Sequence, residues 1–231
     1  MKYLIAHLLE PLSYIIFLIT LGYYSLRINS GLRFKVITVY YLLMSMLVIK
    51  IEILFSQRIS NLHIYNVLFV FTALAFSFYF FGLMHTVIKK VVVVLCGLFT
   101  ILYYFFNASF IDGRELLDSA GYVVSSLGVT IMTFLYFHTL LLNITEEPLS
   151  GRFDFWFICS QFVYHLGTFA IFLSFSYLTQ KMVVNDQYSL NNRDLLTYLW
   201  GAHNILLFAS SLITLIGLLW VKRKSSVART S

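Results

Sequence analysis

Apolar residues run through the chain in long blocks, and polar residues separate these blocks at fairly regular intervals. A helix needs roughly 20 mostly apolar residues to cross about 30 Å of hydrocarbon. Strands of a membrane barrel would instead alternate polar and apolar residues, which these blocks do not do. The blocks therefore predict seven transmembrane helices, at about residues 5–24, 36–55, 64–84, 91–111, 122–142, 155–178 and 195–221.

The composition places the chain in a membrane rather than in water. Of its 231 residues, 60% are hydrophobic and 11% are charged, whereas soluble domains have about 45–50% and about 25%. So few charged side chains do not cover the surface of a water-soluble fold of this size. We therefore expect an all-α, polytopic membrane helix bundle, with one seven-helix transmembrane domain at residues 1–221 and a basic tail at 222–231.

The distribution of lysine and arginine predicts the orientation of the bundle. If the carboxyl terminus is inside, ten of these residues lie in cytoplasmic segments, five lie in outer segments and Lys50 lies within the second span. Because basic loops are retained in the cytoplasm, we expect the N-out/C-in topology. The basic residues lie between apolar blocks rather than on one face, so anionic lipid is the expected partner and nucleic acid is not.

Polar residues inside the predicted spans are the candidates for function, because such residues are costly in hydrocarbon. Those at helical spacing are Gln161, Tyr164, His165 and Thr168 in the sixth span, Trp200, His203 and Asn204 in the seventh, and Thr130 and Thr133 in the fifth.

The depths of the two histidines among these residues allow them to meet near the middle of the membrane. His165 and His203 each lie about 12–15 Å from the nearest end of their spans. Two interpretations follow from these polar faces. They line a small pocket that binds a ligand or a proton, or they are hydrogen-bond contacts between helices with no ligand at all.

Two further possibilities concern charged groups and cofactors. An ion pair between Glu10 and Lys50 would relieve both charges, although Lys50 is also able to extend to the headgroups. No carboxylate is expected at the depth of the two histidines, and both cysteines lie in apolar blocks, so no metal site is predicted. Haem between the two histidines would need small residues opposite them, and Gly167 and Gly201 alone do not decide this, so no cofactor is expected.

Small residues at helical spacing predict positions of close contact between helices. Gly121, Ser125 and Gly128 form one such set in the fifth span, and Ala170 and Ser174 form another in the sixth. Small side chains let helix backbones approach closely in a membrane. Both sets are therefore expected to pack against a neighbouring helix.

The carboxyl-terminal part of the chain resembles a known type of bacterial membrane protein. Asp154, Tyr164 and Gly167, followed by Trp200 and the His203-Asn204 pair, resemble the pattern of small bacterial seven-helix membrane proteins. Those proteins in turn resemble the membrane sensor domains of histidine kinases. The resemblance implies a sensor or accessory signalling role in a bacterial inner membrane, and it carries over no ligand-binding residues.

The expected function is therefore a non-enzymatic membrane sensor or signalling accessory that responds to a small ligand or a proton. Its expected output passes through helix motion to a cytoplasmic or membrane protein partner, and a homo-oligomer is compatible with this role. Two other classes remain open from the sequence. One is a small transporter or pore, and the other is a membrane scaffold or assembly factor.

Overall fold

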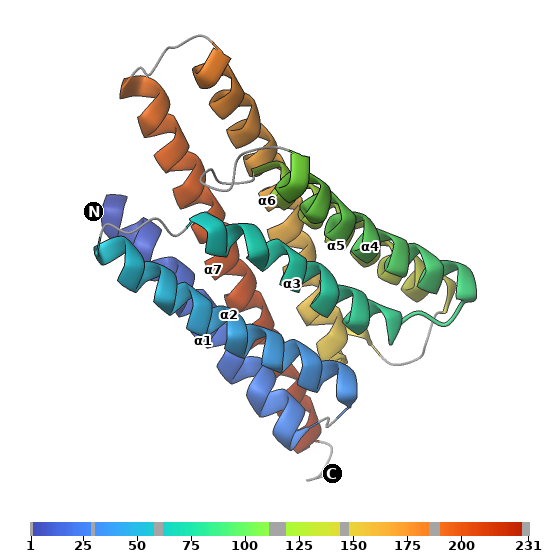
Figure 1. Cartoon of the computed structure of the whole chain (residues 1–231). Helices are drawn as coiled ribbons and strands as arrows, with labels where there is room; N and C mark the ends of the chain where they lie inside the picture. Colours follow the sequence, from blue (N-terminus) through green and yellow to red (C-terminus); the bar gives the residue numbers. More distant parts are fainter. Residues whose placement is uncertain are drawn as a thin grey trace.

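The computed structural model describes residues 2–28, 31–57, 62–110, 119–143, 148–184 and 190–227, and these residues form a bundle of long helices (Figure 1). The helices are α1 (Lys2–Arg27), α2 (Leu32–Ser56), α3 (Leu62–Phe81), α4 (Val87–Phe110), α5 (Ser119–Leu142), α6 (Phe153–Val184) and α7 (Leu190–Val227), and a single turn of 3-10 helix, η1 (Leu149–Gly151), precedes α6.

Six of these helices are long and apolar enough to cross a membrane. Their membrane segments are Leu8–Arg27, Leu32–Leu54, Val87–Asn107, Ser119–Leu142, Phe153–Thr179 and Asp194–Arg223. The apolar part of α3 among the described residues, Val67–Phe81, is shorter. The all-helical, multi-pass architecture is thus confirmed, whereas the crossing by α3 and the orientation of the bundle stay predictions.

Several helices extend beyond the spans expected from hydropathy. Helix α4 begins at Val87 and includes Lys89 and Lys90, and α7 continues into the basic tail as far as Val227. The remainder of that tail, 228–231, lies outside the described residues. Hydropathy detects only the part of a helix that fits the hydrocarbon, whereas backbone hydrogen bonding continues into the polar ends.

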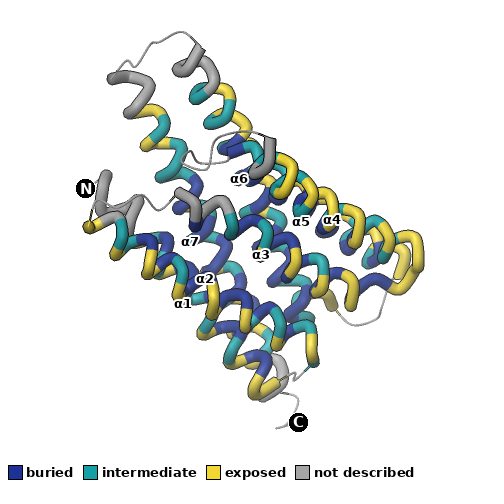
Figure 2. The backbone as a smooth tube through the Cα atoms, in the orientation of Figure 1, coloured by how far each residue is buried: buried dark blue, intermediate teal, exposed yellow. Residues whose placement is uncertain are grey.

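Six helices form a closed ring in the order α1, α2, α3, α5, α6 and α7, each packed against the next. Helix α4 lies outside this ring, against α3 and α5. Only 17% of its membrane segment is buried, compared with 39–44% of the other five. Figure 2 shows the same contrast, because buried residues gather along the inner faces of the ring. A space enclosed by the ring is therefore lined by six helices and not by α4.

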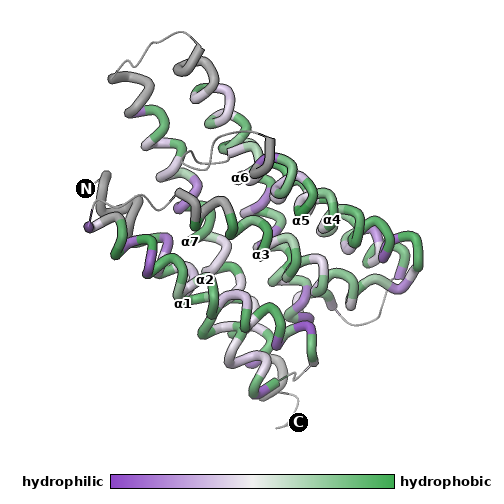
Figure 3. Tube along the Cα trace, in the orientation of Figure 1, coloured by the Kyte–Doolittle hydropathy of each residue, from purple (hydrophilic) through white to green (hydrophobic). Residues whose placement is uncertain are grey.

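The outer surface of the bundle is apolar. Large hydrophobic side chains such as Ile19, Met46, Phe99, Leu141 and Ile216 are exposed around its circumference. Figure 3 shows hydrophobic residues along most of each helix, with hydrophilic ones near the ends and at a few positions inside. Water does not tolerate so much continuous apolar surface, whereas lipid solvates it.

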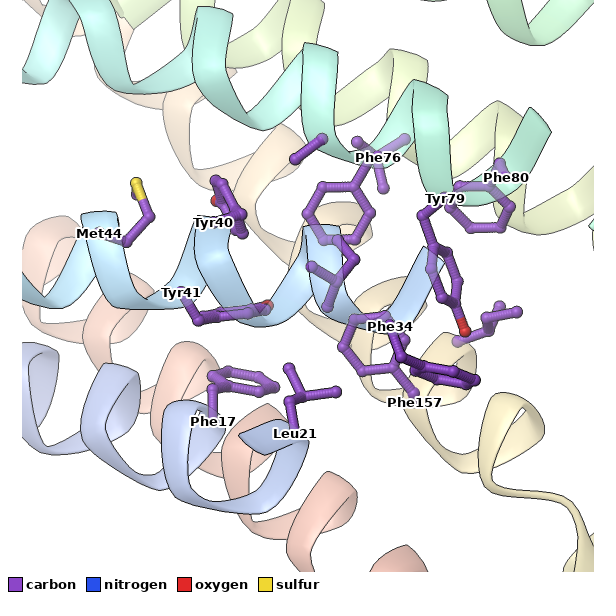
Figure 4. Packing of buried hydrophobic residues seen from close by; sticks show 14 of the residues in the cluster. Phe17, Leu21, Phe34, Tyr40, Tyr41, Met44, Phe76, Tyr79, Phe80 and Phe157 are labelled. Atoms are coloured by element: carbon purple, nitrogen blue, oxygen red, sulfur yellow. The ribbon is translucent and has the colours of Figure 1, made fainter. Parts of the chain in front are cut away.

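A layer of aromatic side chains fills the half of the ring that is nearer to the carboxyl terminus (Figure 4). Phe17 of α1 stacks on Tyr41 of α2 with ring centroids 4.4 Å apart. Phe157 of α6 contacts Phe76 and Tyr79 of α3, at 6.3 and 5.2 Å. All five side chains are almost completely buried. The layer closes the interior of the bundle on this side.

Candidate functional site

A small cavity of about 30 Å³ lies inside the ring, on the side of the aromatic layer that faces the amino-terminal part of α7. All six ring helices contribute to its wall. The lining residues are Glu10, Tyr14, Tyr40, Met44, Leu68, Phe69, Thr72, Tyr122, Ser125, Ser126, Tyr164, His165, Thr168, Trp200 and His203. A space of this size holds one or two water molecules.

His203 of α7 is held in place by two hydroxyl groups of α6. Its Nδ1 lies 3.3 Å from the Thr168 hydroxyl, and its Nε2 lies 3.4 Å from the Tyr164 hydroxyl. The ring of Phe172 lies edge-on to the imidazole at 5.1 Å. Both ring nitrogens of His203 therefore have hydroxyl partners, and its side chain links the two helices.

His165 lies one residue after Tyr164 and has a different environment. It is 4% exposed, and neither ring nitrogen has a hydrogen-bond partner in the described part of the chain. Its ring instead meets Phe76 and Tyr164 edge-on, at 5.3 and 4.8 Å. Buried polar groups are hydrogen-bonded in nearly all proteins. Because His165 lines the cavity, we expect a molecule or ion in the cavity to form the missing hydrogen bond.

Glu10 brings a carboxylate into the same wall. It is 3% exposed, and Tyr14 follows it one turn later on the same face of α1. Lys50, in contrast, is exposed on α2. This arrangement fits the alternative that Lys50 extends to the headgroups, and the candidate ion pair between the two residues stays a prediction. The acid faces the interior because the ring closes around this side of α1.

Four of the predicted site residues lie on the cavity wall: Tyr164, His165, Trp200 and His203. Both histidines thus line the same cavity inside the bundle. The sequence also placed Thr168 on this face, and it lies there as well.

The other four predicted residues are buried but lie away from the wall. The Gln161 side chain accepts a hydrogen bond from the Tyr41 hydroxyl at 3.2 Å. The hydroxyls of Thr130 and Thr133 donate to backbone carbonyls of their own helix, at 2.8 and 2.7 Å. Asn204 is completely buried next to His203. Gln161, Thr130 and Thr133 fit the interpretation as structural hydrogen bonding, although they do not test binding.

Sequence reasoning missed lining residues on α1, α2 and α3, and one on α5. Tyr14, Tyr40, Thr72 and Tyr122 line the cavity, and the Tyr40 and Thr72 hydroxyls lie 2.9 Å apart. Tyrosine counts as apolar in a hydropathy pattern, so these residues did not stand out. The available signal was Glu10 followed by a tyrosine four residues later, since an acid and a hydroxyl on one helix face indicate a polar interior.

A second buried polar group closes the opposite end of the bundle. The Asp154 carboxylate, in the first turn of α6, accepts a hydrogen bond from the Tyr79 hydroxyl at 2.7 Å and pairs with Arg33 Nη2 at 2.9 Å. The three side chains come from α3, α6 and α2. Their contacts link these three helices on the side of the aromatic layer opposite to the cavity. Nothing in the spacing of these residues predicted it.

Metal chemistry is not indicated within the described residues. No three histidine, cysteine, aspartate or glutamate side chains among them come close enough to hold an ion. Cys96 and Cys159 are both free thiols. The cavity therefore offers hydroxyls, one carboxylate, two imidazoles and aromatic rings as its chemistry.

Comparison of the chain with known protein families, with curated proteins and with solved structures finds no match, so any functional assignment rests on the geometry of the bundle itself.

Proposed function

We propose that this protein is a non-enzymatic membrane sensor or signalling accessory of the bacterial inner membrane that responds through its central cavity. The observation that carries the proposal is His165, a buried imidazole without a hydrogen-bond partner among the described residues, on a wall shared with Glu10 and His203. A polar cluster in hydrocarbon is costly and points to function.

The position of the cavity supports a sensing role. Because six helices share its wall, a change in its charge or occupancy favours one arrangement of the ring over another. The titratable groups that face the histidines are Glu10 and Tyr14 of α1, Tyr40 of α2, Tyr122 of α5 and Tyr164 of α6. The aromatic layer closes the path toward the carboxyl-terminal side, which favours a sensor over an open pore. Under this proposal, a separate protein partner receives the output.

We include in this proposal seven spans with the amino terminus outside, in which α3 crosses the membrane. Fluorescent-protein and alkaline-phosphatase reporters fused after Gln57, after His85 and after Ser231 test it. We expect the phosphatase to be active after Gln57 only, and the fluorescent protein to be active after His85 and Ser231, because each crossing changes the side. The same side after Gln57 and His85 would show six crossings.

The test of the site uses Trp200 as a fluorescent reporter in the cavity wall. The chain has three tryptophans, so Trp156→Phe and Trp220→Phe leave Trp200 alone. We expect its emission to change with pH, and His165→Phe to abolish the change while the protein stays at least as stable. Phenylalanine fills the same space and removes a buried polar group that lacks a partner, which costs about 1–3 kcal/mol when unsatisfied.

The matched control is His138→Phe, because His138 is exposed on α5. This variant should keep the full titration of Trp200. If the pH titration of Trp200 emission is unchanged in His165→Phe, the polar residues around the cavity only form hydrogen bonds between helices and have no sensing role. A solute flux into proteoliposomes that depends on His165 would indicate that the protein is a transporter instead.

A further inference from the structure

The described wall of the cavity has the composition of a cation site. It contains one carboxylate, Glu10, and neither lysine nor arginine. Aromatic rings supply much of the remaining surface, including Tyr14, Tyr164 and Trp200. A carboxylate and the face of an aromatic ring both attract positive charge. The occupant that these walls favour is therefore a cation.

His165 adds the requirement that the occupant donates a hydrogen bond. Its two ring nitrogens are buried without a partner in the described structure. A neutral imidazole offers one N–H and one lone pair, and the lone pair needs a donor. Sodium and potassium ions carry no hydrogen, and they favour shells of oxygen ligands. The occupant must instead carry its positive charge on an N–H or O–H group.

The volume of the cavity limits the size of that cation. About 30 Å³ accommodates one or two molecules the size of water. An ammonium ion is about as large as a water molecule, whereas a quaternary ammonium group is several times larger. A transition metal is not favoured, since no three suitable ligands gather among the described residues.

From the charge, the hydrogen-bonding requirement and the size, we infer that the cavity binds an ammonium ion. The ion donates one N–H to the free lone pair of His165 and another toward the Glu10 carboxylate, and its charge lies among the rings of Tyr164 and Trp200. His203 is already engaged by Thr168 and Tyr164, so it orients the wall and is not needed as an acceptor. The inference rests on the proposed function in one respect, because it names the ligand of the same site.

The experiment measures Trp200 fluorescence of the full-length chain in lipid nanodiscs at constant pH and ionic strength. The background again carries Trp156→Phe and Trp220→Phe. Ammonium chloride is titrated against sodium, potassium, methylammonium and tetramethylammonium chlorides. We expect a saturable change with ammonium, a weaker one with methylammonium, and at least about tenfold weaker apparent affinity for the other three.

Two variants and one control test whether ammonium binds at the residues that line the cavity. Glu10→Gln removes the charge and keeps the shape, and His165→Phe removes the acceptor and keeps the ring. Each should weaken ammonium binding at least about tenfold. Glu52→Gln makes the same change on α2, at a position that does not line the cavity, and should leave binding unchanged.

The possible results separate the inference from the proposed function. Equal responses to ammonium and potassium would show a general salt effect and would overturn the inference. A Trp200 signal that follows pH but not ammonium would also overturn it, while the proton-responsive form of the proposed function would remain. If Trp200 responds to neither, both proposals fail. Loss of ammonium binding in Glu52→Gln as well would place the site elsewhere.

Discussion

Replacing Asp154 with alanine will lower the free energy of unfolding by about 2–4 kcal/mol, somewhat less than the 3–5 kcal/mol typical when one partner of a fully buried pair is removed. The carboxylate accepts the Tyr79 hydroxyl and pairs with Arg33. Tyr79 is completely buried and would lose its acceptor, whereas the Arg33 side chain is 29% exposed and is partly rehydrated. Chemical unfolding in one mild detergent, compared with the unsubstituted chain, measures the loss.

A double-mutant cycle shows that the loss comes from this group of three side chains. In Arg33→Met/Asp154→Ala both charges are absent, so the double variant should lose less stability than the sum of the losses in Arg33→Met and Asp154→Ala. Lys35→Met is the charge control, because Lys35 is exposed on the same helix. Additive losses, or a similar loss in Lys35→Met, would mean that the buried pair is not the cause.

The number and approximate place of the helices could be predicted because hydrocarbon requires long apolar segments and leaves the backbone few alternatives. The ends could not, since α4 and α7 continue as helices through charged residues such as Lys90 and Lys222. The position of α4 outside the ring was also beyond prediction. Its sequence is as apolar as those of its neighbours, and only tertiary packing distinguishes a peripheral helix from a ring helix.

The candidate site was predictable where polar residues repeat at helical spacing. Tyr164, His165 and Thr168 lie on one face of α6 and do line the cavity. Gln161 shares that face but lies one turn closer to the aromatic layer, where its side chain accepts a hydrogen bond from the Tyr41 hydroxyl. Spacing thus identifies a face, whereas the depth at which a cavity begins and ends depends on what the opposite helices contribute.

Predictions from small residues succeeded on one helix and failed on another. Gly128 of α5 is buried against α4, where a Cβ would lie 3.7 Å from Cys96. Ala170 and Ser174 are exposed, so the close contact expected there is wrong. A small residue permits close approach but does not specify it, because the partner surface must also be present. Helices α6 and α7 approach closely at Gly217, which the pattern did not single out.

Gly217→Ala will destabilise the protein by about 1–3 kcal/mol, the usual cost of overpacking. A Cβ at Gly217 would overlap the Cβ of Trp156 on α6. That atom is fixed to the backbone, and the indole Nε1 donates to the Ser150 carbonyl at 2.9 Å, so Trp156 is held in place. Helices α6 and α7 must then separate, and the shift in the midpoint of thermal or chemical unfolding measures the cost.

The same substitution elsewhere on α7 makes the test decisive. Nothing lies within 4 Å of a Cβ built at Gly201, so Gly201→Ala adds only the helix preference of alanine and should stabilise the protein by about 0.5–1 kcal/mol. The two variants differ from the parent chain by one methyl group on one helix, and the expected changes have opposite signs. Equal shifts would show that α6 and α7 are not in backbone-limited contact at Gly217. Because His203 lies on α7 and is held by α6, separation of these helices in Gly217→Ala should also weaken the Trp200 response.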